Sequence, residues 1–238
     1  MEKQRLDRFI SNQLNVPRSE AKILIRRGKV SVDTLPIKDP SFIIDVENQK
    51  VECQGLQINY KKYIYIMMNK PSGVLSATSD KKQKTVVDLV PDNLKRSGLF
   101  PVGRLDKDTT GLLLITDDGE FAHNCISPKK GIAKVYEAHL DGEITEEMPE
   151  AFKKGVTLAD GTLCKSAILE SKGGKTVRVT ITEGKYHQIK RMFGVFGLGV
   201  EKLHRASIDG LVLPDDLKTG ECREIAINDL KKLVKNAF

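Results

Sequence analysis

The stretch GRLDKDTTGLLLITDDG, residues 103–119, places a short charged loop directly before an apolar run. The apolar run, Leu112–Ile115, is short and is followed by turn-forming residues, which is typical of a strand buried in a sheet. Asp106 stands on the loop that enters this strand, so its carboxylate is placed to act on a molecule lying above the sheet. On spacing alone, the same acid could be a solvated residue that balances a neighbouring Lys or Arg.

Strands and helices interleave on both sides of this stretch. Further strands are expected at Tyr63–Met68, Val135–Leu140 and Thr176–Thr182. Helices are expected at residues 145–154, 187–196 and, behind an Asn228 cap, 229–235. Because the strands are not joined as regular βαβ units, we expect an α+β fold with a mixed, mainly antiparallel sheet flanked by helices.

The segment EGKYHQIKRMF, residues 183–193, predicts a helix with two unlike faces. Apolar residues within the segment and just after it recur at the spacing of a buried helical stripe: Ile189, Met192, Phe193 and Phe196. Its basic residues fall on the opposite side: His187, Lys190 and Arg191. The pattern indicates a helix that is anchored by apolar contacts and presents a compact cationic face, although an ordinary surface helix has the same pattern.

The first sixty residues predict a separate small module of two helices and a strand. The first helix is amphipathic, with apolar residues at Leu6, Phe9, Ile10 and Leu14. The second helix is expected to begin at a Ser19 cap and to end at Gly28, because glycine tolerates the left-handed conformation that closes a helix. The strand follows at Lys29–Val32.

This amino-terminal module carries most of the positive charge of the chain. Residues 1–30 hold eight Lys or Arg against three Asp or Glu, whereas the whole chain has a formal net charge of +7. Arg18, Lys22 and Arg26 are four residues apart and therefore share one face of the second helix. Such a face is often merely solvated, but it is also the form of a surface that binds the phosphates of RNA.

The composition removes several classes of protein. No apolar run of the 238 residues approaches the roughly 20 residues that a membrane helix needs, and the first residues lack the apolar core of a signal peptide. The four cysteines stand singly, without a CxxC pair: Cys53, Cys125, Cys164 and Cys222. We therefore expect a cytoplasmic protein with no membrane partner and no metal site.

Residues 103–119 resemble the signature of the bacterial ribosomal RNA pseudouridine synthases of the RsuA/RluB/E/F group. Three further segments agree with that group, in order: Asn69–Gly73, Lys134–Tyr136 and Tyr186–Phe193. The amino-terminal module resembles the S4 RNA-binding domain, so the resemblance covers essentially the whole chain. It implies an S4-like domain at residues 1–60 and a pseudouridine synthase catalytic domain at residues 61–238.

The resemblance implies that the protein converts a uridine of ribosomal RNA to pseudouridine. This isomerisation needs neither a cofactor nor a metal, and its expected partner is ribosomal RNA or a ribosomal assembly intermediate, bound by a monomer. The chain is most similar to the small-subunit (16S) branch, whose target is uridine-516, with the large-subunit (23S) enzymes as the close alternative. Two other classes remain open: a non-catalytic RNA-binding assembly factor and a glycosidase that releases the base.

The resemblance also assigns roles to individual residues. Asp106 matches the catalytic carboxylate of the group, and Lys190 matches the cation beside it. Tyr136 matches the active-site tyrosine, whose ring can stack on uracil and whose hydroxyl can exchange a proton. The other residues expected to support the site or contact the RNA are Arg104, Arg191, Lys70, Arg18, Lys22 and Arg26.

Two of these residues have specific expected tasks. Arg104 matches the arginine that fills the space left when the uridine is turned out of the RNA stack, where its planar guanidinium can stack and pair with phosphate. Lys70 precedes Pro71 and is expected to support the loop that carries the carboxylate, with the proline fixing the direction of the chain.

Overall fold

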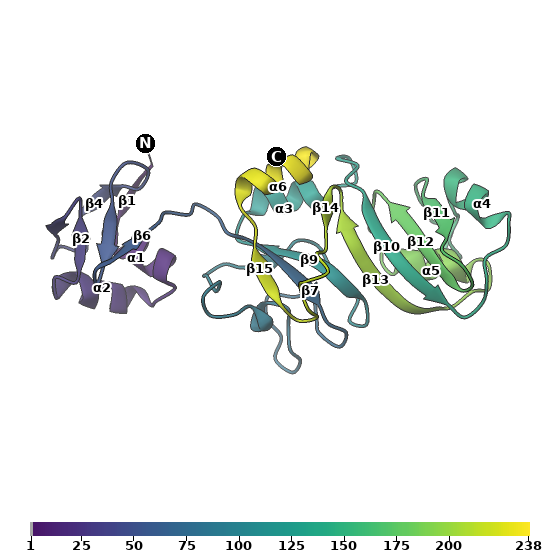
Figure 1. The fold of residues 1–238 in the computed structure, drawn as a ribbon, viewed down its shortest axis with the longest axis horizontal. Helices are drawn as coiled ribbons and strands as arrows, with labels where there is room; N and C mark the ends of the chain where they lie inside the picture. Colours follow the sequence, from purple (N-terminus) through teal and green to yellow (C-terminus); the bar gives the residue numbers. More distant parts are fainter. Residues whose placement is uncertain (1) are drawn as a thin grey trace. The chain divides into compact units, whose positions relative to one another are not determined.

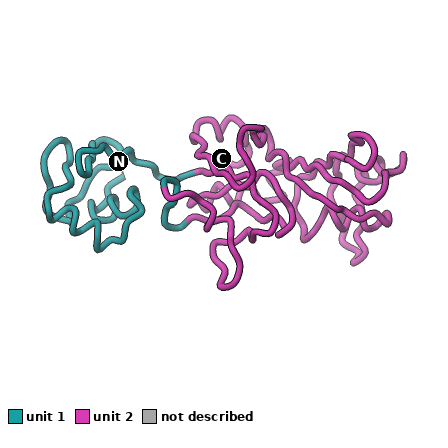
Figure 2. Tube along the Cα trace, turned by 60° about the horizontal axis from the view of Figure 1, so that its bottom comes forward, with its two compact units in different colours: residues 1–64, 93–98 teal, residues 65–92, 99–238 magenta. Residues whose placement is uncertain are grey.

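The structure is a computed structural model that describes residues 2–238 (Figure 1). These residues form two compact units, each considered by itself below (Figure 2). The first unit comprises the chain up to Ile64 together with Asn93–Gly98. The second comprises Tyr65–Asp92 and Leu99–Phe238.

The division between the units lies after Ile64 rather than after residue 60, where the sequence placed it. Hydrogen bonds account for the difference. Lys61 exchanges two of them with Gln13, through its amide and its carbonyl oxygen, both at 3.1 Å. The Arg96 guanidinium donates to the same carbonyl at 2.8 Å, which holds Asn93–Gly98 in the first unit.

The first unit packs two short helices against small strands. Its elements are β1 (Lys3–Arg5), α1 (Leu6–Leu14), α2 (Arg18–Arg26), β2 (Val30–Val32), β3 (Leu35–Pro36), β4 (Ile43–Asp45), β5 (Val51–Cys53) and β6 (Leu56–Ile58). Strands β3-β2-β5-β6 form one antiparallel sheet, and β1 pairs with β4. Apolar residues of both helices and of the strands, including Phe9, Ile25 and Val51, form one buried cluster.

The predicted Ser19 cap of the second helix is wrong. Helix α2 begins at Arg18, the residue before Ser19. Pro17 precedes it directly, and no side chain caps the helix. Proline accounts for this start, because its fixed φ suits the entry to a helix and its missing N–H is not needed there. The predicted end is confirmed, since Gly28 follows the helix with a φ of +67°.

The second unit is built on a nine-stranded sheet. Its elements are β7 (Tyr65–Lys70), η1 (Val87–Leu89), β8 (Phe100–Pro101), β9 (Thr110–Thr116), α3 (Gly119–Ile126), β10 (Lys134–Leu140), α4 (Met148–Lys154), β11 (Ile168–Ser171), β12 (Thr176–Ile181), α5 (Gln188–Gly194), β13 (Val200–Ile208), β14 (Leu211–Val212), β15 (Cys222–Glu224), α6 (Ile227–Leu233) and η2 (Lys235–Ala237).

The strand order of the sheet is β11-β12-β10-β13-β9-β7-β15, with β14 beside β13 and β8 beside β9. Every pair is antiparallel except β9 with β13. Helices α3 and α6 lie together near one end of the sheet, and α4 and α5 lie near the other (Figure 1). The α+β class and the mixed, mainly antiparallel sheet predicted from the sequence are therefore confirmed.

Two details of the predicted helices are wrong. Helix α6 begins at Ile227 behind Ala226, so Asn228 lies inside it and does not cap it. Helix α5 ends at Gly194, so Phe196 lies beyond it and is 37% exposed rather than part of a buried stripe. The ring of Phe196 nevertheless stacks on Phe152, with the centroids 6.0 Å apart.

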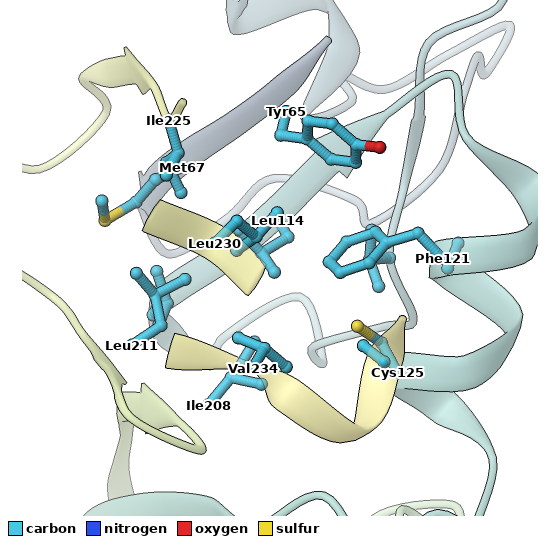
Figure 3. Packing of buried hydrophobic residues seen from close by; sticks show 14 of the residues in the cluster. Tyr65, Met67, Leu114, Phe121, Cys125, Ile208, Leu211, Ile225, Leu230 and Val234 are labelled. Carbon is cyan, nitrogen blue, oxygen red and sulfur yellow. The ribbon is translucent and has the colours of Figure 1, made fainter. Parts of the chain in front are cut away.

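A cluster of buried apolar residues fixes helices α3 and α6 against strands β7 and β9 (Figure 3). The Tyr65 ring meets Phe121 edge to face, with the centroids 5.2 Å apart. Its hydroxyl donates to the Asp118 carboxylate at 2.7 Å, and that carboxylate in turn caps α3. This packing holds β9 rigidly, and β9 is the strand that follows the loop bearing Asp106.

The parallel contact between β9 and β13 requires Gly111. The contact is short, with Thr110 opposite His204 and Gly111 opposite Arg205. A Cβ at Gly111 would lie 2.3 Å from the Arg205 carbonyl oxygen, and its φ is +99°. Any other residue would force the strands apart, so the glycine of the charged motif joins the two halves of the sheet.

In the part of the chain that the structure describes, no helix combines the length and the apolar character needed to cross a membrane.

Candidate active site

The Asp106 side chain stands on the loop between β8 and β9 and is 27% exposed. A turn forms immediately after it, because the Thr109 amide donates to the Asp106 carbonyl oxygen at 3.1 Å. The sequence motif therefore folds as predicted, with its carboxylate displayed at the start of a buried strand.

Lys70 supports this loop through hydrogen bonds to backbone carbonyl oxygens. Its side chain is completely buried at the end of β7. The ammonium lies 3.0–3.2 Å from four backbone carbonyl oxygens, those of Pro71, Asp106, Lys107 and Thr109. Burial lowers the pKa of Lys70 to about 8. The ammonium thus holds the backbone of the loop together and does not line the cavity. This placement fits the expected supporting role of Lys70.

Ser76 holds the loop from another direction. Its hydroxyl donates to the Leu105 carbonyl oxygen at 2.8 Å and accepts from the Leu105 amide at 3.0 Å. Gly73 adds a backbone hydrogen bond to the Lys107 carbonyl oxygen at 2.8 Å. Hydrogen bonds therefore hold the backbone of Leu105 and of Lys107, the two residues that flank Asp106 in the chain. Ser76 could not be identified from the sequence, because an isolated serine in a loop belongs to no recognisable pattern.

Two acids share the Lys190 ammonium. Its Nζ atom lies 3.9 Å from Asp106 Oδ2 but 2.7 Å from Asp108 Oδ2. The hydrogen bond from Lys190 lowers the pKa of Asp108. The structure thus brings the predicted cation beside Asp106, but its closer partner is the neighbouring, more exposed carboxylate.

His187 is a site residue that the sequence analysis placed only on the cationic face of the helix. Its Nε2 atom lies 3.4 Å from Asp106 Oδ1. It precedes α5 rather than lying in it, with a φ of +47°, a conformation that non-glycine residues rarely adopt. This backbone turns the imidazole toward the carboxylate and stacks it on the Tyr186 ring, with the centroids 3.9 Å apart.

Tyr136 lies on β10 and is 7% exposed. The buried Arg205, on the adjacent strand β13, donates from Nη1 to the Tyr136 hydroxyl at 3.4 Å and from Nε to the Leu112 carbonyl oxygen at 2.7 Å. The other terminal nitrogen of Arg205, Nη2, is buried without a hydrogen-bond partner among residues 2–238. Arg205 therefore fixes the tyrosine, a role that the sequence analysis did not assign.

Asp106, His187 and Tyr136 border a small cavity of about 70 Å³. The residues that line it are Arg104, Leu105, Asp106, Thr109, Tyr136, Ile181, Gly184, Lys185, His187, Gln188, Ile189 and Leu203. Drug-sized ligands need pockets of roughly 300–1,000 Å³. This cavity is much smaller, and its size suits one planar ring. A carboxylate, an aromatic wall and apolar side chains suit a flat polar ring whose bonds are to be rearranged.

Arg104 and Arg191 differ in their placement. Arg104 lines the cavity, is exposed and has no hydrogen-bond or ion-pair partner among the described residues. Arg191 does not line it. Its guanidinium pairs with Asp160 at 2.5 Å and donates to the Tyr186 carbonyl oxygen at 3.4 Å. The structure thus places Arg191 outside the cavity lining, next to Asp160 and the Tyr186 backbone.

The three basic residues predicted on helix α2 of the first unit also differ. Arg18 pairs with the fully buried Asp7 at 3.0 Å, and Arg5 binds the same carboxylate at 3.1 Å. Burial raises the pKa of Asp7, but the hydrogen bonds from the two arginines outweigh it and lower that pKa to about 2. Lys22 and Arg26 have no such partner among residues 2–238, so their charges are available to a ligand.

The described residues, 2–238, hold no group of three or more His, Cys, Asp or Glu placed to bind a metal ion. Cys125, near Arg205, is buried, and burial raises the pKa of its thiol to about 12.

Two family models match this chain. Residues 64–194 match the RNA pseudouridylate synthase family, and residues 4–50 match the S4 domain. The first match covers the residues that bring Asp106, Tyr136 and Lys190 together.

Individual proteins agree over nearly the full length. The chain is 42% identical to an RNA pseudouridine synthase of Bacillus subtilis, covering 96% of this chain and 98% of that protein. It is 39% identical to ribosomal small subunit pseudouridine synthase A of Vibrio cholerae, covering 97% of this chain and 100% of that protein. A crystal structure of a pseudouridylate synthase superposes with a TM-score of 0.68 at 35% sequence identity. The match covers 97% of this chain and 99% of the chain in that structure. The chain therefore belongs to the RNA pseudouridine synthase family and carries an S4 domain ahead of the catalytic domain.

Proposed function

We propose that this enzyme isomerises one uridine of small-subunit ribosomal RNA, uridine-516 of the 16S molecule, to pseudouridine. The observation that carries the proposal is that Asp106 and Tyr136 line one ring-sized cavity, with Lys190 Nζ 3.9 Å from the Asp106 carboxylate. Similarity over the whole length to a ribosomal small subunit enzyme supports the choice of RNA. The partner is then ribosomal RNA or an assembly intermediate of the small subunit, bound by a monomer.

The reaction breaks the N1–C1′ bond of the uridine, turns the uracil in the cavity and joins C1′ to C5. The proton on C5 is lost, and N1 gains one, so that atoms balance without a redox change. As the nucleophile, Asp106 bonds either to C1′ as N1 leaves or to C6 of the base, and that bond breaks again as the product forms. The Lys190 ammonium, with Nζ 3.9 Å from Asp106 Oδ2, stabilises the carboxylate charge, and the His187 imidazole lies 3.4 Å from Oδ1.

The cavity walls keep the detached uracil in place. The Tyr136 ring offers a stacking surface, and the hydroxyl next to Arg205 can exchange a proton with the base. Thr109 lines the same cavity, and its Oγ1 is buried without a partner among residues 2–238. A buried polar atom of this kind requires a hydrogen bond, which a carbonyl oxygen of uracil can accept.

The target uridine has to leave the RNA stack, at a cost of a few kcal/mol. Arg104 supports this step because it lies at the cavity, is exposed and has no partner among the described residues. Its planar guanidinium can occupy the vacated position and contact neighbouring phosphates.

The direct test is to incubate the purified protein with 16S RNA, 23S RNA and small-subunit assembly particles and to map pseudouridine in each. We expect one new pseudouridine, at uridine-516 of the small-subunit RNA or particle. Modification confined to 23S RNA would assign the enzyme to the large subunit. Binding without modification of any substrate would indicate an assembly factor, and free uracil would indicate a glycosidase.

Lys22 and Arg26 supply a prediction about RNA binding by the first unit. Exchanging both for Ala should weaken RNA binding and flatten its salt dependence, because each phosphate contact contributes about 0.7–0.9 to the slope of log K against log salt. We expect the slope to fall by about 1.4–1.8, measured as the Kd between 50 and 200 mM salt.

The matched comparison is Arg18→Ala on the same helix. Because Arg18 is bound to the buried Asp7, its loss should lower the Tm of the first unit by about 5 °C or more. An unchanged salt slope in the double variant, with its fold intact, would rule out this helix face as an RNA contact.

A further inference from the structure

Tyr186 is an exposed aromatic residue beside the active site that the reaction does not use. It is 74% exposed, more than any other aromatic residue within 2–238. Isolated exposed apolar residues are ordinary on protein surfaces. Tyr186 differs because its neighbours in the chain, Lys185 and His187, both line the cavity for the target base.

The Tyr186 ring is held in one orientation. One of its faces stacks on the His187 imidazole, with the centroids 3.9 Å apart and the planes inclined by 18°. The Arg191 guanidinium, fixed by Asp160, donates to the Tyr186 carbonyl oxygen at 3.4 Å. The ring is therefore ordered before any ligand binds, and its high exposure leaves the second face open to solvent.

The stack is also connected to the reacting group. His187 lies between the Tyr186 ring and the Asp106 carboxylate, whose Oδ1 is 3.4 Å from the imidazole Nε2. A planar group stacked on the outer face of Tyr186 would therefore lie at the rim of the cavity, next to a base held against Asp106. Arg104, on the cavity wall, adds a cation for the connecting phosphates.

We propose that the outer face of Tyr186 is a stacking site for a second, unpaired base of the substrate RNA, close in sequence to the target uridine. The inference rests on the proposed RNA-modifying function. A nucleobase is the ligand of choice because every base has a flat aromatic face, and stacking on an aromatic side chain contributes about 1–3 kcal/mol per base. An ordered ring costs little further entropy when it binds such a ligand.

The first test compares Tyr186→Leu with Tyr186→Phe and Tyr186→Trp. Leucine keeps an apolar side chain but has no flat face, so we expect Kd and KM for RNA to rise about 5- to 150-fold. Phenylalanine and tryptophan should stay within about twofold of the native protein. Most of the loss should appear in KM, since the outer ring face does not touch the reacting atoms. The control is Ile168→Ala, which removes another exposed apolar side chain, 60% exposed, from β11.

The second test identifies the base with RNAs that carry one abasic site near the target uridine. One abasic position should weaken binding by the native protein as much as Tyr186→Leu does, and combining the two changes should cause no further loss. If the losses in binding caused by Tyr186→Leu and by an abasic site add fully at every tested position, the proposal is overturned. So would a Tyr186→Leu defect confined to kcat, because it would show that the ring only supports His187. Failure of the native protein to modify any RNA would instead contradict the proposed function.

Discussion

Asp106→Asn is expected to abolish pseudouridine formation while leaving the protein folded and able to bind RNA. Asparagine matches the shape of the side chain but cannot act as a nucleophile. Removing a catalytic nucleophile costs on the order of 10⁴- to 10⁶-fold in rate. The measurement is single-turnover release of tritium from RNA labelled at C5 of uridine, because that hydrogen leaves only when C5 joins the ribose. RNA affinity and Tm report the intact fold.

Asp108→Asn is the matched control for this experiment. Asp108 stands two residues away on the same loop, but its carboxylate is 68% exposed and pairs with Lys190 at 2.7 Å. Its exchange should change the rate by less than about tenfold, because Lys190 can then turn fully to Asp106, now 3.9 Å away. If Asp108→Asn were the inactive variant and Asp106→Asn the active one, the nucleophile would have to be reassigned.

Lys70→Met is expected to lower kcat by about 100-fold or more, although Lys70 does not line the cavity. The ammonium contacts four carbonyl oxygens around the catalytic loop, and methionine can bind none of them. The loop should then shift, and a displacement of about 1 Å in a catalytic group can cost about 10²-fold in rate. The kcat is measured at saturating RNA, with Asp106→Asn as the inactive reference. Native kcat in a folded Lys70→Met protein would contradict the supporting role.

The same lysine predicts an alkaline limit to activity. Burial lowers the pKa of Lys70 to about 8, and the protonated form has the donors that the carbonyl oxygens require. The active form is therefore the low-pH form, and kcat should fall as the pH rises through about 8. Burial also lowers the pKa of Lys134 to about 8. Lys134→Met separates the two lysines, because an alkaline limit that disappears in this variant would belong to Lys134 and contradict the role of Lys70.

Much of the catalytic domain could be predicted because its motifs are continuous in sequence. The run from Arg104 to the apolar strand specifies both the strand and the loop that displays Asp106. Other site residues depend on contacts between distant segments. Ser76 meets Leu105 through hydrogen bonds that no local pattern encodes, and Arg205 reaches Tyr136 only because β10 and β13 are neighbours.

The differences among the basic residues have the same origin. Helical spacing correctly groups Arg18, Lys22 and Arg26, but it does not reveal that α1 buries Asp7, which binds Arg18. Likewise, the family resemblance places Lys190 beside Asp106 but does not reveal that Asp108, on the same loop, lies closer to its ammonium. His187 was placed within a helix because a left-handed residue just before a helix leaves no trace in hydrophobic periodicity.

The order of the strands has a consequence for synthesis on the ribosome. The first unit needs no residue beyond Gly98, so it can fold as soon as that part of the chain has emerged. The catalytic pocket draws residues from Arg104 to Leu203, and Gly111 finds its partner Arg205 only near the end of translation. If the first unit binds RNA as proposed, a nascent chain would hold RNA before it could alter it, and a prematurely terminated product would occupy the RNA without modifying it.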